Sequence, residues 1–211
     1  MYPLLSILEV TTDDFLLPRT PAQLIETTAA AADVFPVVFA DPYAVPVARA
    51  ATPAIAALVA AGVPHTVLAY RHDPRTEAFG DEAVDELTRD GGDGLVAEQI
   101  FKTLVVALPK GLGVAVLPVP SKLSLKAAAA ALGAPKATMA DPAAAQRSSG
   151  YVVGGISPLG QRRALPTVVD SSALRWDRVL CSAGKRGLDV ALDPRDLIRL
   201  TNAVTAEITA L

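Results

Sequence analysis

The sequence predicts an α+β protein in which helices and strands are mixed without regular alternation. Several segments begin with a Thr, Ser or Asp that can cap a helix, several apolar runs have the length of a strand, and 17 Pro and 14 Gly supply turns. A doubly wound parallel sheet needs strands and helices in strict alternation, which this order does not provide. The 211 residues, 51% of them hydrophobic, suffice for one domain with a sizeable core.

The first elements follow from local signals. Thr52 can cap a helix that Pro53 starts and Gly62 ends. The apolar run His65–Tyr70 predicts a strand. A short acidic helix is expected over Asp81–Leu87.

A hairpin is expected in the middle of the chain. Phe101–Leu108 and Val114–Val119 are apolar runs of strand length, and the turn residues Pro109–Gly111 separate them. Ser124 can then cap a helix over Leu125–Leu132.

Two further helices and four short strands are expected toward the C-terminus. One helix opens at Asp141-Pro142 and runs toward Arg147, and the other opens at Asp193-Pro194. The last helix is expected to carry its apolar residues at helical spacing, namely Leu197, Leu200 and Val204. The strands are expected at Tyr151–Val153, Thr167–Val169, Val179–Ser182 and Leu188–Ala191.

Residues 1–50 differ from the rest in composition. They hold six Pro and an alanine-rich patch with little periodicity. Because Pro blocks helix interiors and central strands, we expect a loosely ordered extension before a domain that spans residues 51–211, with one short helix near Ala22–Ala32. Neither a membrane-spanning run nor a basic, secretory N-terminus is found, so no membrane association is expected.

Composition narrows the function classes. The single cysteine, Cys181, excludes a disulfide framework and favours the reducing cytoplasm. The only histidines are His65 and His72, and no Cys or His pair has zinc-ligand spacing, so no metal or other cofactor is expected. Residues 99–186 carry twelve basic and three acidic side chains, whereas residues 51–98 carry three and nine. The basic segment indicates either a phosphate-binding surface or an ordinary solvated one.

Three familiar functional motifs are incomplete in this sequence. The segment Gly155–Leu159 resembles a nucleophile elbow, but Leu159 replaces the second Gly and no His follows. Gly184-Lys185 lacks the remaining residues of a phosphate-binding P-loop, and Gly111 and Gly113 lack the third Gly of a dinucleotide fingerprint. Cys181 lies in an apolar run, which is typical of a small buried side chain rather than a nucleophile.

Three features remain. Lys102 stands within an apolar strand, where it is either a solvated strand-end lysine or a cation held at a pocket. The segment Gly154–Gly160 is rich in glycine and is either a tight connection or a loop whose N–H groups bind an oxyanion. Gly184–Asp189 places Lys185 and Arg186 on a turn beside a carboxylate, which is either an ordinary hairpin turn or a binding turn.

These features occur in a set of segments that together resemble the YbaK/EbsC family of Cys-tRNA(Pro) deacylases, which is related to the editing domain of bacterial prolyl-tRNA synthetases. The resemblance runs from about Thr52 to about Asn202, lacks a counterpart for residues 1–50, and shows a longer loop at Asp90–Ala97. The segments that carry it are Tyr70–Pro74, Phe101–Thr103, Ala140–Pro142, Gln146–Tyr151, Val153–Gln161, Leu165–Thr167 and Gly184–Asp189.

The resemblance implies one α+β domain whose mixed sheet, flanked by helices, curls into an open barrel. It implies that Lys102 is the principal functional lysine and that the segment Gly154–Pro158 lines the aminoacyl pocket. An ester needs donors aimed at the oxygen that gains charge, and backbone N–H groups of Gly154 or Gly155 could supply them. The resemblance further implies substrate-binding roles for six residues, namely Tyr70, Ser157, Pro158, Lys185, Arg186 and Asp189.

The implied reaction is cleavage of the aminoacyl ester of mischarged Cys-tRNA(Pro), and also of Cys-tRNA(Cys), with the thiol of the substrate attacking its own carbonyl. Aminoacyl-tRNA is therefore the expected partner, and prolyl-tRNA synthetase is a candidate partner. Two alternatives stay open: a deacylase for another small aminoacyl group, as in Ala-tRNA(Pro), and a non-catalytic module that binds tRNA or a synthetase.

Overall fold

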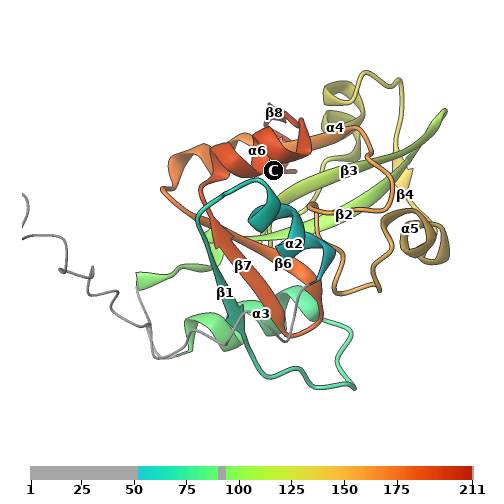
Figure 1. Ribbon diagram of the computed structural model, residues 1–211. Coiled ribbons are helices and arrows are strands. Elements are labelled where there is room, and N and C mark those ends of the chain that lie inside the picture. The colour runs from blue at the N-terminus through green and yellow to red at the C-terminus, as the bar shows by residue number, and fades with distance from the viewer. Residues whose placement is uncertain (1–51, 90–93, 211) are drawn as a thin grey trace, which may run out of the picture. The chain divides into compact units, whose positions relative to one another are not determined.

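The computed structural model describes residues 52–89 and 94–210, which build one mixed sheet with helices packed around it (Figure 1). The sheet order is β1-β7-β6-β2-β3-β5-β8, and β4 pairs with β2 beside this path. The strands are β1 (His65–Ala69), β2 (Ile100–Leu108), β3 (Gly111–Pro118), β4 (Thr138–Met139), β5 (Thr167–Asp170), β6 (Val179–Lys185), β7 (Leu188–Leu192) and β8 (Val204–Ala206).

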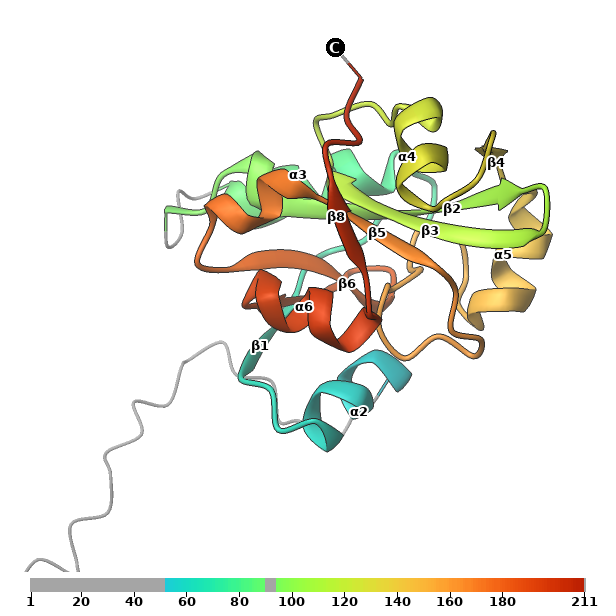
Figure 2. The ribbon, with the colours of Figure 1, turned by 90° about the horizontal axis from the view of Figure 1, so that it is seen from above.

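Antiparallel and parallel pairing meet in this sheet. The hairpins β2–β3 and β6–β7 and the pairs β1–β7 and β2–β4 are antiparallel, whereas β2–β6, β3–β5 and β5–β8 are parallel. The half formed by β1, β7 and β6 turns away from the long β2–β3 hairpin (Figures 1 and 2). The expected α+β class with a mixed, curled sheet is confirmed.

The helices begin where the capping residues predict. Thr52, Ser124, Asp141 and Asp193 each accept a hydrogen bond from a backbone N–H in the first turn. The helices are α2 (Pro53–Ala60), α3 (Phe79–Thr88), α4 (Leu125–Ala131), α5 (Pro142–Ser149) and α6 (Pro194–Thr201), with 3₁₀ turns η4 (Ala97–Gln99) and η5 (Ser171–Arg175).

Two local expectations are wrong. The segment Tyr151–Val153 forms a turn and no strand, because the Tyr151 hydroxyl is drawn inward to donate to Leu159 O at 2.9 Å. Val204 lies in β8 and not in the last helix, because Asn202 takes a left-handed conformation (φ 48°) that ends α6. The short strands β4 and β8 were not expected. The helix expected near residues 22–32 lies outside the described residues.

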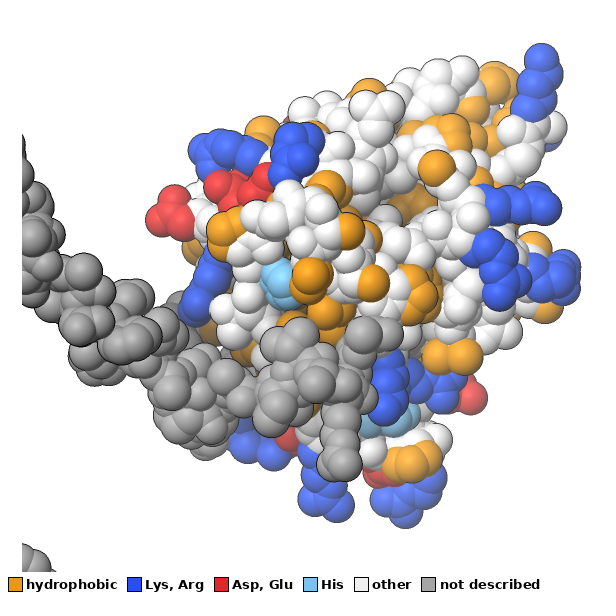
Figure 3. Space-filling model, in the orientation of Figure 1, with side chains coloured by type: hydrophobic (Ala, Val, Ile, Leu, Met, Phe, Trp, Pro, Cys, Tyr) orange, Lys and Arg blue, Asp and Glu red, His pale blue; other side chains and the backbone are white. Residues whose placement is uncertain are grey.

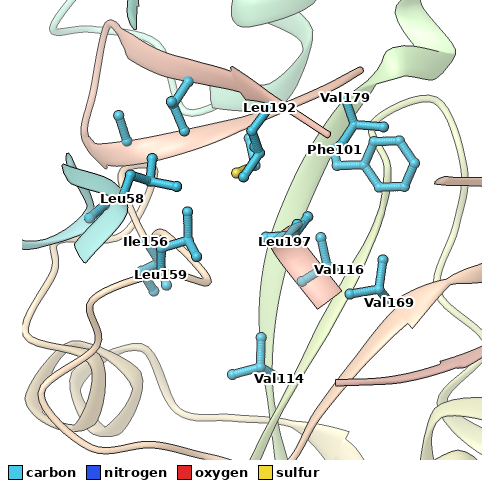
Figure 4. Close-up of a cluster of buried hydrophobic side chains, with 14 of the residues drawn as sticks. Leu58, Phe101, Val114, Val116, Ile156, Leu159, Val169, Val179, Leu192 and Leu197 are labelled. Atoms are coloured by element: carbon cyan, nitrogen blue, oxygen red, sulfur yellow. The ribbon is translucent and has the colours of Figure 1, made fainter. Parts of the chain in front are cut away.

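The main core lies between the sheet and the helices α2 and α6 (Figure 4). Leu58 of α2 and Leu197 of α6 are fully buried; Leu58 lies beside Ile156 and Leu159, and Leu197 lies beside Val116 of β3. Burial of each such side chain contributes about 1.5–3 kcal/mol to folding. The core therefore fixes the two helices against the sheet.

No helix within the described ranges approaches the length needed to cross a bilayer. The longest, α3, has 10 residues, whereas a crossing takes about 20 apolar ones.

Gly160 joins the glycine-rich segment to α2. Its φ of +61° lies in the left-handed region, and a Cβ built on it would overlap the backbone carbonyl of Pro53. Gly133, which follows α4, has a similar φ of +67°, but a Cβ there would meet no atom within 4 Å. Substitutions at these two glycines therefore separate the cost of the left-handed backbone from the cost of steric overlap.

We expect Gly160→Ala to destabilise the protein by about 3 kcal/mol or more, because left-handed strain adds to overlap with rigid backbone. Gly133→Ala, the matched control, should cost about 1 kcal/mol, since it adds the strain alone. Urea unfolding followed by circular dichroism measures both. Equal losses in the two variants would contradict the close packing of Gly160 on α2.

Candidate functional site

A cavity of about 400 Å³ opens beside the central strand β2. Its walls come from the start of α3, from β2, from α5, from the segment that follows α5, and from β6 and β7. Four of the predicted site residues line it: Tyr70, Lys102, Gly154 and Asp189. The structure thus brings together residues that lie up to 119 positions apart in the sequence.

The cavity exists because β2 lacks a neighbour for part of its length. Pairing with β6 ends at Phe101↔Cys181, and pairing with β4 begins at Val106↔Met139. Beyond Ser182, β6 shifts its register against β7, which marks a β-bulge. Residues 102–104 of β2 therefore border open space on this side.

Lys102 lies at this interruption with its cationic end directed across the hairpin. Its Nζ donates to the carbonyl oxygen of Val119 at 2.9 Å. Burial lowers the pKa of its ammonium group, and the nearby Asp81 carboxylate opposes that shift. An ammonium group has three donors, so two remain for a ligand.

Asp189 supplies a buried carboxyl group on β7, opposite Ser182 of β6. Its side chain is 4% exposed, and no described residue donates a hydrogen bond to it. Burial raises its pKa to about 7. A buried carboxyl group that lines a cavity and has no cationic partner of its own is well suited to receive a cationic ligand.

Tyr70 directly follows the strand β1 and lies close to this carboxyl group. Its backbone N–H donates to Gly187 O at 3.0 Å, which ties it to the β6–β7 turn. Burial, and secondly the charge of Asp189, raises the pKa of its hydroxyl group. The phenol therefore stays protonated and can donate a hydrogen bond.

The glycine-rich segment divides into a cavity part and a supporting part. Gly154 lines the cavity, and the structure shows no acceptor for its N–H among the described residues. The N–H of Gly155 instead donates to Val152 O at 2.9 Å, so it is not free to bind an oxyanion. Ser157 is fully buried, with its Oγ accepting from the N–H of Leu159, and Pro158 is buried beside it.

The two cations of the β6–β7 turn also lie outside the cavity lining. Lys185 is exposed. The guanidinium group of Arg186 lies 4.5 Å from the centre of the Phe79 ring, and its Nε donates to Val153 O at 2.9 Å. Arg186 therefore holds an aromatic wall of the cavity rather than facing the cavity itself.

Phe79, Thr103 and Ser182 line the cavity and were missed by sequence analysis. A Cβ on Gly154 would lie within 2.7 Å of the Phe79 ring, which shows how closely the ring covers this glycine. Thr103 adjoins Lys102 in sequence, and that adjacency is the one signal that could have identified it. Phe79 and Ser182 carry no local pattern that distinguishes them from core residues.

Cys181 is not a nucleophile in this arrangement. Its side chain is fully buried in the main core, and burial raises the pKa of its thiol. Within residues 52–89 and 94–210, no group of three or more His, Cys, Asp and Glu side chains could hold a metal ion.

Basic side chains lie on and beside α5, one of the elements that line the cavity. Arg162 packs on Gly150 at the end of α5, the helix that also carries Arg147. On the face shown in Figure 3, Lys and Arg side chains lie around the edge, several of them on the side where α5 lies, and hydrophobic side chains lie nearer the middle. Such a rim can contact a polyanion that reaches toward the cavity.

The geometry provides a cation, a backbone donor, a neutral phenol and the acidic side chains of Glu77, Asp81 and Asp189 around one small space. The sequence also matches a known family of proteins. The model of the aminoacyl-tRNA editing domain matches residues 92–200. A protein of Enterococcus faecalis with the provisional name Cys-tRNA(Pro)/Cys-tRNA(Cys) deacylase EbsC is 39% identical over 117 residues, which cover 55% of this chain and 71% of that protein.

Solved structures agree on the fold. The crystal structure of a proposed trans-editing enzyme for prolyl tRNA synthetase superposes with a TM-score of 0.64 at 25% identity, covering 75% of this chain and 96% of that one. The hypothetical protein APE2540 gives a TM-score of 0.63 at 24% identity over 75% of this chain and all of that one. The chain therefore belongs to the YbaK family of aminoacyl-tRNA editing domains.

Proposed function

We propose that this protein deacylates Cys-tRNA(Pro), and also Cys-tRNA(Cys), with the aminoacyl group held in the cavity beside β2. The observation that carries the proposal is the joint presence of Lys102, Gly154 and Asp189 on one cavity of about 400 Å³. This space suits a single small amino acid and the ribose to which it is esterified. The name of the Enterococcus faecalis relative supports these two substrates.

Each group has a partner in an aminoacyl ester. The carboxylate of Asp189 receives the α-ammonium group, which is the cation that the buried carboxyl group lacks. The N–H of Gly154 and the ammonium group of Lys102 donate to the ester oxygens, where negative charge develops in the transition state. Tyr70 can donate to the ribose or to Asp189.

The substrate supplies the nucleophile in this mechanism. Its thiolate sulfur attacks the ester carbonyl, the bond from the carbonyl carbon to the ribose oxygen breaks, and the proton lost by the thiol ends on that oxygen. The products are tRNA with a free terminal hydroxyl and a cyclic thiolactone, which water then opens to cysteine. The burial of Cys181 supports this route, because the cavity presents no thiol of the protein to the ester.

The tRNA body approaches across the basic rim. The segment 99–186, with a net charge of +9, contributes Arg147, Arg162 and Lys185 to the surface around the cavity. Phosphate contacts of this kind position the substrate without identifying the amino acid. The identity of the amino acid is then decided within the cavity.

Lys102→Ala should lower single-turnover deacylation of Cys-tRNA(Pro) at least about tenfold, which corresponds to a loss of about 1.4 kcal/mol of transition-state stabilisation. Lys110→Ala, on the exposed turn between β2 and β3, is the matched control and should leave the rate unchanged. Thermal melting of both variants should match the original protein. Full activity in a folded Lys102→Ala variant would exclude the assigned role.

Substrate choice should appear in the chemical step. We expect Cys-tRNA to be cleaved in preference to Ser-tRNA and Ala-tRNA, because Ala lacks a nucleophile and the Ser hydroxyl ionises far less readily than a thiol. A pocket alone separates such small side chains by only about 1–3 kcal/mol. Single-turnover rates for the three substrates, with mass analysis of the released products, make the comparison. Equal rates for Ala-tRNA and Cys-tRNA would disprove attack by the thiol.

Asp189→Asn should change how stability depends on pH. Because the folded-state pKa of Asp189, about 7, exceeds its ordinary value of 3.8, the folded protein holds a proton there that the unfolded chain releases. The stability of the original protein should therefore fall as the pH rises from about 4 to about 7, by about 1.4 kcal/mol for each unit of pKa shift.

The Asn variant lacks this ionisation. It should match the original protein near pH 4 and exceed its stability at pH 8, as measured by urea unfolding at both values. It should also lose affinity for aminoacyl-tRNA, because an amide cannot offer the α-ammonium group a negative charge. Parallel stability curves for the two proteins would show that Asp189 ionises normally.

A further inference from the structure

Thr103 carries polar groups that the fold leaves without partners. Its hydroxyl oxygen is buried, and no described residue forms a hydrogen bond with it. Almost all buried hydroxyl groups in folded proteins are hydrogen-bonded, so an exception calls for an explanation. Thr103 also lines the cavity, so this exception lies in the wall of a space that a ligand can occupy.

The interruption of the sheet explains why no strand satisfies this residue. Backbone groups of alternate residues in β2 point to alternate neighbours. Val105 O accepts from the N–H of Ala140 on the β4 side, so the N–H and C=O of Thr103 face the same side. Pairing with β6 has already ended at Phe101, and pairing with β4 has not begun. The polar backbone of Thr103 therefore borders the cavity.

The surroundings of the hydroxyl group are apolar. Strand alternation places the side chains of Phe101, Thr103 and Val105 on one face of β2. Phe101 and Val105 are buried in the main core and also line the cavity, as do Ala145 and Ile156. The side chain of Lys102 leaves the opposite face of the strand and reaches Val119. The Thr103 hydroxyl is thus a polar group packed within an apolar wall, and rotation about χ1 would bring it to the cavity surface.

We propose that the Thr103 hydroxyl group binds the side-chain thiol of the aminoacyl group and thereby distinguishes a cysteinyl from an alkyl side chain. The inference rests on the proposed function, which already pairs the α-ammonium group with Asp189 and the ester oxygens with Gly154 and Lys102. The thiol is the polar group of a cysteinyl ester that is left. The hydroxyl accepts from the S–H group and donates to the thiolate once it forms.

This arrangement discriminates by leaving a buried polar group unsatisfied when the wrong ligand binds. A methyl group in place of the thiol fills a similar space but cannot pair with the hydroxyl group. Thr103 acts in this scheme as a specificity-determining and positioning residue, because it holds the nucleophilic sulfur without reacting itself.

Binding of stable analogues tests the proposal separately from the reaction. The probes are two tRNAs whose terminal adenosine carries cysteine or 2-aminobutyrate through an amide, which neither water nor the thiol cleaves readily. The original protein should prefer the cysteine analogue by about fivefold, the effect of one hydrogen bond. Thr103→Val should bring the ratio of the two Kd values near one, and Thr103→Ser should retain the preference.

Thr103→Val should also leave the melting temperature unchanged or higher, because it replaces an unsatisfied hydroxyl group by a methyl group of the same shape. If that variant does not fold, Thr103→Ala provides the same comparison of the two probes. An undiminished preference in either folded variant, or equal binding of the two probes by the original protein, would overturn the assignment. Failure of both probes to bind the original protein would instead refute the proposed function.

Discussion

The cavity depends on the departure of β6 from β2 after Phe101. A strand that kept its neighbour would bury its edge in hydrogen bonds and leave no space beside Lys102. Gly184 makes the departure possible, because its φ of +94° suits the bulge and because the Tyr151 ring occupies the place of a Cβ. The hydroxyl of Tyr151, whose pKa burial raises to about 12, is fixed in turn to the glycine-rich segment. One bulge thus opens the site and anchors its wall.

Local signals in the sequence predicted most elements of the fold, since caps such as Thr52 and Ser124 act within one turn of a helix. They failed where a distant contact decides the conformation. Tyr151–Val153 has strand composition, but the tyrosine turns inward toward a segment that no local pattern reveals. The two-residue strand β4 exists because β2 has a free edge there, which is again a property of the sheet and not of its own residues.

The site was predictable to a similar extent. Lys102 and Gly154 stood out because a cation in an apolar strand and a run of glycines are unusual, and both line the cavity. Gly155 and Arg186 stood out for the same reasons, yet the structure uses one as a turn residue and the other as a support for an aromatic ring. Sequence pattern identifies the segment that forms a site, whereas strand pleat and turn geometry decide which of its residues face the ligand.

The stacking of Arg186, Phe79 and Gly154 has a consequence for how such a site can evolve. The Phe79 ring contacts the guanidinium group of Arg186, and it also lies against Gly154, which has no side chain. None of the three residues can therefore change size alone. A larger residue at position 154 would drive the ring into the cavity, and a smaller one at position 79 would leave both neighbours unsupported. A change of the bound aminoacyl group toward a bulkier one should therefore require substitutions at positions 79, 154 and 186 together. Such substitutions would be inherited as a unit.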